Sequence, residues 1–243
     1  MARAVTSSHD ELALRLLAQG EMEVLGLMPR ASNYTFLARV RLGDAEAHAI
    51  YKPRDGEVPL WDFPDGTLCK REVAAYVVAS SLGWPSVPPT VLRDGPEGIG
   101  SAQLFIEFDP RHHFFTLQEQ RTDDFRRIAV FDAIVNNADR KGGHCLLGKD
   151  GEIHVIDHGV CFSSSPKLRT VIWDFAGDPI PEVLLADVAR LEAELRDGPT
   201  RAALAGLLDP IELDATHRRT ETIIRSKRFP LPGPERPYPW PAV

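Results

Sequence analysis

Apolar residues recur at intervals of three and four positions in several stretches of the chain. Such spacing places them on one face of an amphipathic helix, which is then buried against the rest of the protein. Helices are predicted on this ground at 8–20, 68–83, 124–137, 181–195, 201–208 and 210–225. The tail at 229–243 is rich in proline and lacks this period, so we expect it to be extended, either loose or laid along the body.

Alternation of polar and apolar residues marks a second kind of element, the β-strand. Strands are predicted at 21–27, 34–42, 45–52, 90–93, 101–108, 145–147 and 153–156. The strands at 34–42 and 45–52 are joined by the short turn Gly43–Asp44, as in an antiparallel hairpin. Most strands fall before residue 108 and most helices after it, which predicts an α+β protein.

Two aspartates stand out in the segment from Phe131 to Gly159. The helix at 124–137 leads into a polar turn that contains Asp139, and a short hairpin then ends at Asp157. Phosphoryl transfer needs a metal ion held against the phosphates and an acceptor oxygen aimed in line. Since one carboxylate can bind the metal while the other orients the acceptor, the pair predicts a phosphotransferase.

The same segment resembles the catalytic and metal-binding segments of the protein-kinase-like superfamily. The pattern is similar to that of bacterial HipA-like kinases and of type II phosphatidylinositol 4-kinases, NxDRxxxxN followed by a strand and IDxG. Here it reads Asn137, Asp139, Arg140, His144, Ile156, Asp157 and Gly159. Through the motif NNADRKGGH the whole chain also resembles bacterial proteins labelled phosphatidylinositol 3- and 4-kinase-like. That label names a fold relationship and does not establish a lipid substrate.

The resemblance implies a two-lobed, protein-kinase-like α+β fold. Residues 1–108 would form an N-lobe, a small antiparallel sheet with one helix that covers the nucleotide. Residues 109–228 would form a mainly helical C-lobe that carries the catalytic loop and the metal-binding hairpin. Residues 229–243 would be a proline-rich tail outside both lobes.

The same resemblance implies roles for residues of the catalytic segment. Asp139 would orient the acceptor, Arg140 beside it would be a further catalytic residue, and Asp157 would bind Mg²⁺. Where the family has an asparagine as second metal ligand, this chain has His144. A neutral imidazole is a poorer partner for Mg²⁺ than an amide or carboxylate oxygen, so His144 bears on whether ordinary phosphoryl transfer is possible.

Lys52 and Glu72 complete the kinase-like set. Lys52 closes a predicted strand, where kinases place a lysine against the α- and β-phosphates of ATP. Glu72 lies near the start of the helix at 68–83, and we expect an ion pair that holds the lysine at the nucleotide. A strand lysine alone is usually just solvated. The order Lys52, Glu72, Asp139, Asp157 is what favours a kinase.

Further residues are expected to contact ATP because of their place in this order. The turn at 30–33 contains no glycine, so the phosphates would meet Ser32 and the backbone amide of Asn33. Gln103 or Phe105 would face the back of the adenine pocket. The segment that joins the lobes would bind the adenine edge through its backbone, and it consists of Phe105, Ile106, Glu107 and Phe108.

Composition limits the classes of protein and partner. Of the 243 residues, 43% are hydrophobic and 26% charged, as in a globular enzyme, and no apolar run reaches the ~20 residues that span a bilayer. The net charge of −7 argues against general binding to nucleic acid or to an anionic membrane. The three cysteines lack metal-ligand spacing and no leader peptide is recognisable, so we expect a cytoplasmic protein with reduced thiols.

Three functions remain open on the sequence alone. The first is an active ATP- and Mg²⁺-dependent kinase whose acceptor is a hydroxyl of a protein or a small molecule, a lipid being less favoured by the acidic charge. The second is a nucleotide-binding pseudokinase or an AMP-transferring enzyme, which His144 and the glycine-free turn would suit. The third is a non-catalytic interaction protein in which Asp139 and Arg140 form a structural ion pair. It leaves the kinase-like order of residues unexplained.

Overall fold

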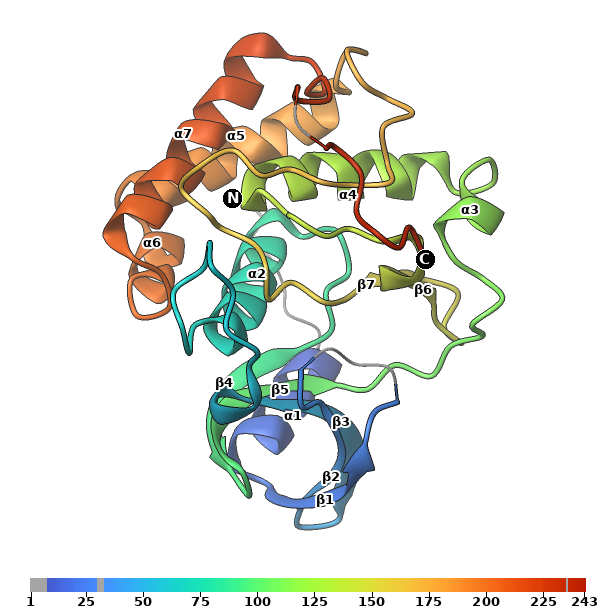
Figure 1. Cartoon of the computed structure of the whole chain (residues 1–243), viewed down its shortest axis with the longest axis vertical. Coiled ribbons are helices and arrows are strands. Elements are labelled where there is room, and N and C mark those ends of the chain that lie inside the picture. The colour runs from blue at the N-terminus through green and yellow to red at the C-terminus, as the bar shows by residue number, and fades with distance from the viewer. Residues whose placement is uncertain (1–7, 30–32, 235) are drawn as a thin grey trace.

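The chain folds into an α+β structure with a β-sheet at one end of the molecule and a set of helices at the other (Figure 1). The computed structural model describes residues 8–29, 33–234 and 236–243. The α+β class expected from the sequence is confirmed. The lobe boundary at residue 108 and the tail boundary at residue 228 stay predictions.

A five-stranded antiparallel sheet has the strand order β1-β2-β3-β5-β4. Its strands are β1 (Glu21–Leu27), β2 (Phe36–Leu42), β3 (Ala45–Pro53), β4 (Thr90–Gly95) and β5 (Gly98–Leu104). Helix α1 (Ser8–Gln19) covers one face, where Leu16 and Leu17 pack with Val40, Ala49 and Ala102. Since α2 (Leu68–Leu82) also packs on β4 and β5, two helices rather than one accompany the sheet.

The pairing of β3 with β5 determines on which face of the sheet each side chain of β3 lies. Lys52 lies opposite Ser101 of β5, and Ile50 lies opposite Gln103. Successive side chains of a strand point to opposite faces, so Ile50 and Lys52 share one face while Tyr51 is fully buried on the other. Lys52 is thereby directed away from the hydrophobic cluster under α1.

Helix α2 is buried along most of its length, including two of its charged residues, Arg71 and Glu72. Arg71 is only 1% exposed. Its guanidinium donates to Glu212 of α7 (Pro210–Ser226) and to the Cys161 carbonyl, both over 2.7 Å. It also lies 4.9 Å from the centroid of the Phe63 ring. Arg71 thus links α2 to the C-terminal helices.

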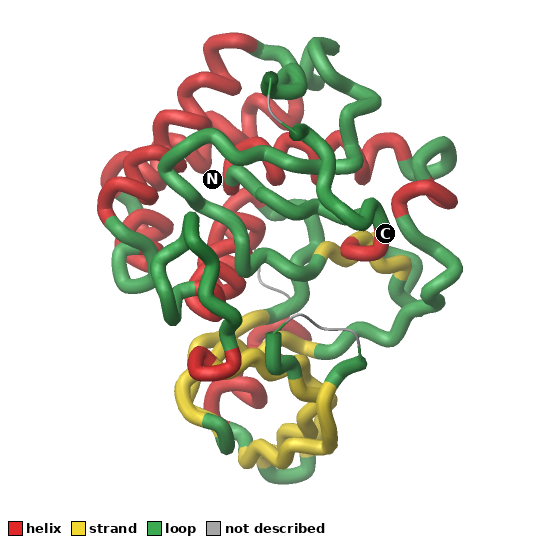
Figure 2. The backbone as a smooth tube through the Cα atoms, viewed as in Figure 1, coloured by secondary structure: helices red, strands yellow, loops and turns green. Residues whose placement is uncertain are grey.

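The C-terminal part of the chain is mainly helical (Figure 2). Its other helices are α3 (Phe114–Leu117), α4 (Thr122–Val135), α5 (Glu182–Asp197) and α6 (Pro199–Leu204). One large hydrophobic cluster joins α4, α5 and α7 to α2, with Phe131 and Leu191 fully buried in it. The helices predicted at 124–137, 181–195, 201–208 and 210–225 are confirmed with shifted ends.

The short helix α3 was not predicted. It begins at Phe114, whose ring packs edge-on against Phe125 with centroids 4.9 Å apart. The neighbouring Phe115 ring lies 2.8 Å from where a Cβ of Gly142 would stand. A side chain at Gly142 would clash there, so α3 supports the loop that follows Asp139.

The proline-rich tail lies along the helical part, and the chain ends near the β6–β7 hairpin (Figure 1). The Pro237 carbonyl accepts hydrogen bonds from Thr170 N–H (3.0 Å) and the Trp173 indole (3.1 Å), and the Ala242 carbonyl accepts from Gly142 N–H (2.8 Å). Of the two expected arrangements, the tail adopts the docked one. It is held by backbone carbonyls rather than by Trp240, which is 78% exposed.

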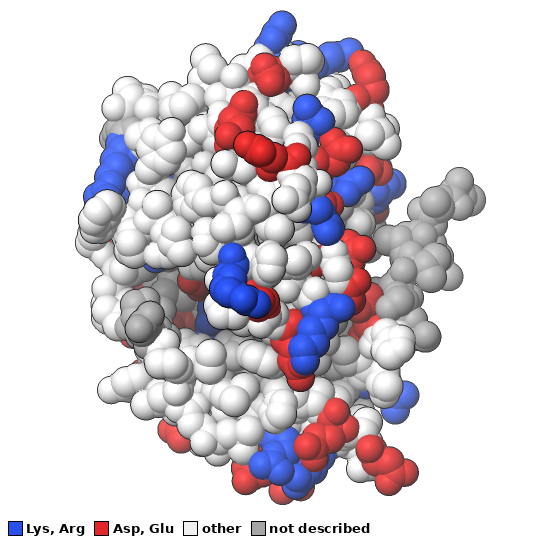
Figure 3. All heavy atoms as spheres, turned by 90° about the vertical axis from the view of Figure 1, so that its right-hand side faces the viewer, with Lys and Arg blue, Asp and Glu red and all other residues white. Residues whose placement is uncertain are grey.

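Charges of both signs are spread over the surface. On the face shown in Figure 3, Lys and Arg are interspersed with Asp and Glu and do not gather into one basic patch. Within the described ranges, none of the helices combines the length and the apolar character that crossing a bilayer requires.

Candidate functional site

A cavity of about 750 Å³ lies between the sheet and the segment that carries the two aspartates. Its walls come from β3 and β5, from the connection between β3 and α2, and from residues between 138 and 169. The residues that the sequence analysis derived from separate motifs all line it, namely Lys52, Glu72, Asp139, His144 and Asp157. The fold therefore brings together side chains that are far apart in the sequence.

Lys52 lies between two carboxylates. Its Nζ donates to Glu72 Oε1 and, over 2.9 Å, to Asp157 Oδ1. Glu72 Oε2 accepts the N–H of His158 over 2.9 Å, so Glu72 also joins α2 to the segment that follows β7 (Ile153–Val155). Burial disfavours the charged ammonium, but Asp157 and Glu72 outweigh it and raise the pKa of Lys52 above its ordinary value. Lys52 is held in its charged form.

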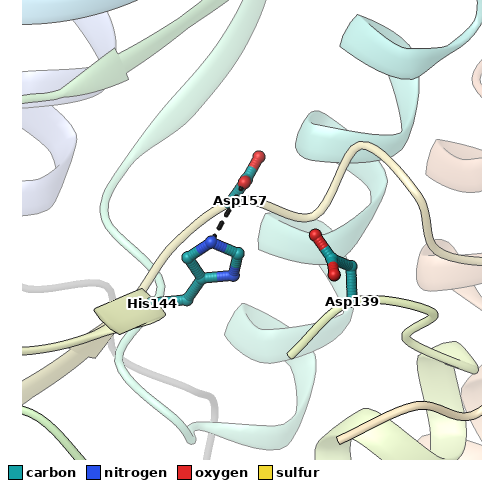
Figure 4. A group of neighbouring side chains, drawn as sticks. All are labelled: Asp139, His144 and Asp157. Atoms are coloured by element: carbon teal, nitrogen blue, oxygen red, sulfur yellow. Dashed lines mark ion pairs between the residues drawn. The ribbon is translucent and has the colours of Figure 1, made fainter. Parts of the chain in front are cut away.

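Asp139, His144 and Asp157 form a compact group (Figure 4). One possible ligand atom from each lies within 4.8 Å of the other two, and His144 Nε2 is 3.3 Å from Asp157 Oδ2. Asp139 Oδ2 also pairs with Lys141 Nζ over 3.0 Å. Carboxylate oxygens and an imidazole nitrogen at these separations can hold a divalent cation. Both aspartates, to which the sequence assigned different roles, are thus within reach of one ion.

His144 ends the short turn η2 (Gly142–His144), which leads into β6 (Cys145–Leu147). Burial, opposed by the nearby Asp157, lowers the pKa of His144 to about 4. The ring is therefore neutral at pH 7. Its Nδ1 accepts the N–H of Lys141 over 3.4 Å, a weak hydrogen bond, while Nε2 faces Asp157. With Nδ1 accepting, the neutral ring carries its proton on Nε2, toward Asp157. Binding a metal through Nε2 would require the other tautomer, with the proton on Nδ1 and the hydrogen bond from Lys141 given up.

Asp157 has an uncommon backbone conformation. Its φ of 62° lies in the left-handed region, which Asp and Asn adopt more readily than other non-glycine residues. The Lys52 ammonium lowers the pKa of the Asp157 carboxyl below its usual range. The residue therefore presents an ionised carboxylate to the cavity.

Arg140 is buried away from the cavity. Its guanidinium, fully buried, pairs with Asp132 of α4 over 2.9 Å and donates to the Ile156 carbonyl over 3.0 Å. It also lies 2.8 Å from His158 Nε2. Arg140 was predicted as a catalytic residue, and we correct this to a positioning role, because it links the loop of Asp139 to α4 and to the residue before Asp157. The ion pair between Asp139 and Arg140 that a purely structural role would require does not form.

Breaking the pair of Asp132 and Arg140 is expected to destabilise the protein strongly. Asp132→Ala leaves a buried guanidinium without its carboxylate, which costs about 3–5 kcal/mol. Asp214→Ala is the control, since its pair with Arg201 is open to solvent and water screens the two charges. The free energy of unfolding, measured with urea, should separate the two variants. Similar losses in both would contradict the structural role of the pair.

Most of the residues predicted to contact ATP line the cavity. Its lining includes Asn33, Gln103, Phe105, Ile106 and Phe108. The Glu107 side chain is directed elsewhere and forms an ion pair with Lys149. Ser32 lies outside the described residues. Asn33 uses its side-chain oxygen to accept the N–H of Val58 over 2.8 Å, which ties the first turn to the connection after β3.

Some polar residues of the cavity wall were not predicted. Glu57 accepts the N–H groups of Leu68 (3.1 Å) and Cys69 (2.8 Å) and so caps α2 from a distant position in the chain. Lys141 pairs with Asp139, and its place within NNADRKGGH could have indicated this. Arg169 carries no local signal in the sequence, because only the folded chain brings it to the cavity.

No model of a known protein family matches the chain. Individual proteins of similar sequence do match it. Protein Rv2133c of Mycobacterium tuberculosis is 43% identical over 98% of this chain and 98% of its own length. Phosphatidylinositol 4-kinase gamma 4 of Oryza sativa is 30% identical over 51% of this chain and 26% of its own length. This chain therefore spans about a quarter of the plant protein.

Solved structures share the fold at low sequence identity. Fam20 of hydra, solved with sugar, matches with a TM-score of 0.58 and 12% identity over 92% of this chain and 89% of that one. The proinflammatory kinase CtkA of Helicobacter pylori matches with a TM-score of 0.52 and 14% identity, over 88% of this chain and 94% of that one. At such identity the likeness shows the fold alone. The two-lobed kinase-like fold expected from the motifs is confirmed.

Proposed function

We propose that this chain, which belongs to the same family as Protein Rv2133c, is an ATP- and Mg²⁺-dependent phosphotransferase. The observation that supports the proposal is the meeting of Lys52, Glu72, Asp139 and Asp157 at one cavity in a kinase-like fold. Kinases need a strand lysine paired with a helix glutamate, and a metal-binding aspartate beside it, at the same time. The pairs of Lys52 with Glu72 and with Asp157 satisfy this requirement.

The adenine is proposed to lie against the segment at 105–108. Ile106 lines the cavity, and its N–H and C=O make no hydrogen bond with any described part of the chain. They can therefore pair with the polar edge of the base. Leu146 and Ile156 supply apolar walls, as a base requires in a pocket with few polar contacts.

The phosphates are proposed to lie between Lys52 and the group of Asp139, His144 and Asp157. Lys52 would contact them as a fixed positive charge. Asp157 and His144 would hold the metal ion, which when bound neutralises charge on the transferring phosphoryl group. The ionised Asp157 fits that use, since metal ligands must be unprotonated at the binding atom. The neutral His144 ring fits it in the tautomer that carries its proton on Nδ1.

Asp139 is proposed to orient the acceptor hydroxyl and to take its proton. The acceptor oxygen would bond to the γ-phosphorus while the bond to ADP breaks. Burial raises the pKa of Asp139, against the opposing effect of Lys141. A carboxylate with a raised pKa is a better proton acceptor, which suits this role.

The acceptor is proposed to be a hydroxyl of a protein or a small molecule, and the setting the cytoplasm. The net charge of −7 favours a soluble acceptor over a lipid in an anionic membrane. Cys69, Cys145 and Cys161 are free and buried, as suits a reducing compartment.

The proposal is tested by mass spectrometry of ATP and of the protein after incubation with Mg²⁺ or Mn²⁺ and candidate acceptors. We expect ADP, and a phosphate added to the acceptor or to the protein. Addition of AMP with release of pyrophosphate would contradict phosphoryl transfer, because the two groups add different masses.

His144 is expected to shift metal preference toward Mn²⁺, because a transition-metal ion accepts imidazole more readily than Mg²⁺ does. His144→Asn restores an amide oxygen. It should improve binding of Mg²⁺ relative to Mn²⁺ by roughly tenfold, or about 1.4 kcal/mol. Calorimetric titration of each metal alone measures the ratio of the two Kd values. If the ratio is the same in the variant and the wild type, His144 is not a metal ligand.

A further inference from the structure

Arg169 is a cation of the cavity wall to which the proposed reaction gives no role. Among the described residues, three basic side chains line the cavity, those of Lys52, Lys141 and Arg169. Lys52 pairs with Glu72 and Asp157, and Lys141 pairs with Asp139. Within residues 8–29, 33–234 and 236–243, the guanidinium of Arg169 has no hydrogen bond and no ion pair. Arg169 is thus available to an anion that enters the cavity.

The backbone places Arg169 beside Asp139. Arg140 and Thr170 form a parallel β-bridge, in which Arg140 N–H donates to the Arg169 carbonyl over 3.0 Å. Arg169 N–H donates to the Asn137 carbonyl over 2.9 Å. Arg140 and Thr170 are both buried. Because side chains alternate along extended chains, their neighbours Asp139 and Arg169 face the other way, and both line the cavity.

The connection between β3 and α2 encloses this side of the cavity. Asp62 pairs with Lys167 over 2.8 Å, and their side chains are 14% and 13% exposed. Lys167 Nζ lies 5.1 Å from the centroid of the Trp61 ring. Trp61 and Asp62 line the cavity together with Arg169. The connection is tied to the segment just before Arg169, and a cavity of about 750 Å³ has the size of sites that hold small molecules.

We infer that the acceptor is a small anionic alcohol whose phosphate or carboxylate group is bound by Arg169 while its hydroxyl group is held at Asp139. A guanidinium suits these anions because two parallel N–H donors can reach two oxygens of the same group. The inference rests on the proposed function, since Asp139 defines where the hydroxyl lies. In the reaction the acceptor oxygen bonds to the γ-phosphorus, ADP leaves, the hydroxyl proton passes to Asp139, and the anion at Arg169 is unchanged.

Inorganic phosphate is the first probe, titrated by calorimetry into protein saturated with Mn²⁺ and a non-hydrolysable ATP analogue. With the nucleotide site filled, phosphate should bind to the wild type through Arg169. Arg169→Gln should bind it at least about tenfold more weakly, and Arg169→Lys should be intermediate because a point charge lacks the two-pronged contact. Arg225→Gln, which changes an exposed arginine of α7, should bind like the wild type.

Arg169→Gln should unfold at the same urea concentration as the wild type, because the Arg169 side chain has no polar partner in the described chain. Equal phosphate binding by wild type and Arg169→Gln, or none by the wild type, would overturn the inference. Binding of the ATP analogue is read separately. If the analogue binds and phosphate does not, only the acceptor inference fails. If the analogue does not bind, the proposed function fails as well.

Two further probes distinguish a free phosphate ester from a lipid headgroup. Glycerol 3-phosphate is tested as a competitor of phosphate, and vesicles of phosphatidylcholine are tested with and without phosphatidylglycerol. Competition without retention on vesicles would support a soluble acceptor. Retention on phosphatidylglycerol vesicles that Arg169→Gln loses would support a headgroup with the same chemistry. An acidic protein phosphorylated equally well by Arg169→Gln and the wild type would contradict the inference.

Discussion

Asp157→Asn is expected to abolish the stabilisation that nucleotide and metal together give the wild-type protein. A ligand that binds only the folded state stabilises it by about 2.7 kcal/mol at 100 times its Kd. Asp157 faces both Lys52 (2.9 Å) and His144 (3.3 Å), so its carboxylate is the negative charge at the centre of the proposed metal site. The substitution removes that charge and keeps the shape of the side chain.

The backbone conformation at residue 157 should be the same in Asp157→Asn as in the wild type. Asn tolerates the left-handed conformation of residue 157 (φ 62°) as well as Asp does, so the fold should be retained. Asp150→Asn is the matched control, because Asp150 lies in the turn of the same hairpin and pairs with His154 over 2.9 Å, outside the cavity. The unfolding temperature is measured with and without ATP and metal. A rise in Asp157→Asn equal to that of the wild type would mean that Asp157 does not bind the metal.

Asp139→Asn is expected to retain nucleotide binding and to lose transfer by about 10²–10⁴-fold, the usual contribution of a general base. An amide cannot take the hydroxyl proton, although it can still lie beside Lys141. The rate of ADP formation at saturating ATP and metal measures the loss. Asp123→Asn, at a position of α4 that is 81% exposed, should react at the wild-type rate.

Because Asp139 lies in one compact group with His144 and Asp157, nucleotide binding by Asp139→Asn shows whether Asp139 is itself a metal ligand. If Asp139→Asn loses nucleotide binding as fully as Asp157→Asn does, Asp139 acts as a metal ligand and its assignment to the acceptor is wrong. Undiminished transfer by Asp139→Asn would remove it from the reaction altogether.

Much of the candidate site could be predicted because its signals are local. Asp139 and Asp157 belong to one helix, loop and hairpin segment, so the chain itself keeps them close. Lys52 lies near the end of a strand that alternates clearly, and Glu72 lies near the start of a helix that is apolar along most of its length. These patterns depend on neighbouring residues, so each element could be predicted from the sequence. The meeting of the four residues at one cavity was expected only from their kinase-like order along the chain. Their chemical roles stay predictions.

Other features could not be predicted, because they depend on contacts with residues far along the chain or with backbone groups. Arg71 is buried because Glu212, 141 residues away, offers it a carboxylate. Arg140 points into the protein because Asp132 offers it a buried carboxylate, and a buried charge is tolerated only with a partner of opposite charge. A single sequence shows the charged residue but not the partner. The tail binds Gly142 through a backbone carbonyl, which carries no residue-specific signal, and α3, with 4 residues, is too short to show a period.

The most direct test is a calorimetric titration of the wild-type protein with ATP, in Mg²⁺, in Mn²⁺ and in a chelator. We predict binding of one ATP for each chain in the presence of either metal, and a large loss of affinity in the chelator. Absence of binding under all three conditions would contradict a nucleotide site between Lys52 and Asp157. The chain would then be a kinase-shaped protein without the kinase reaction.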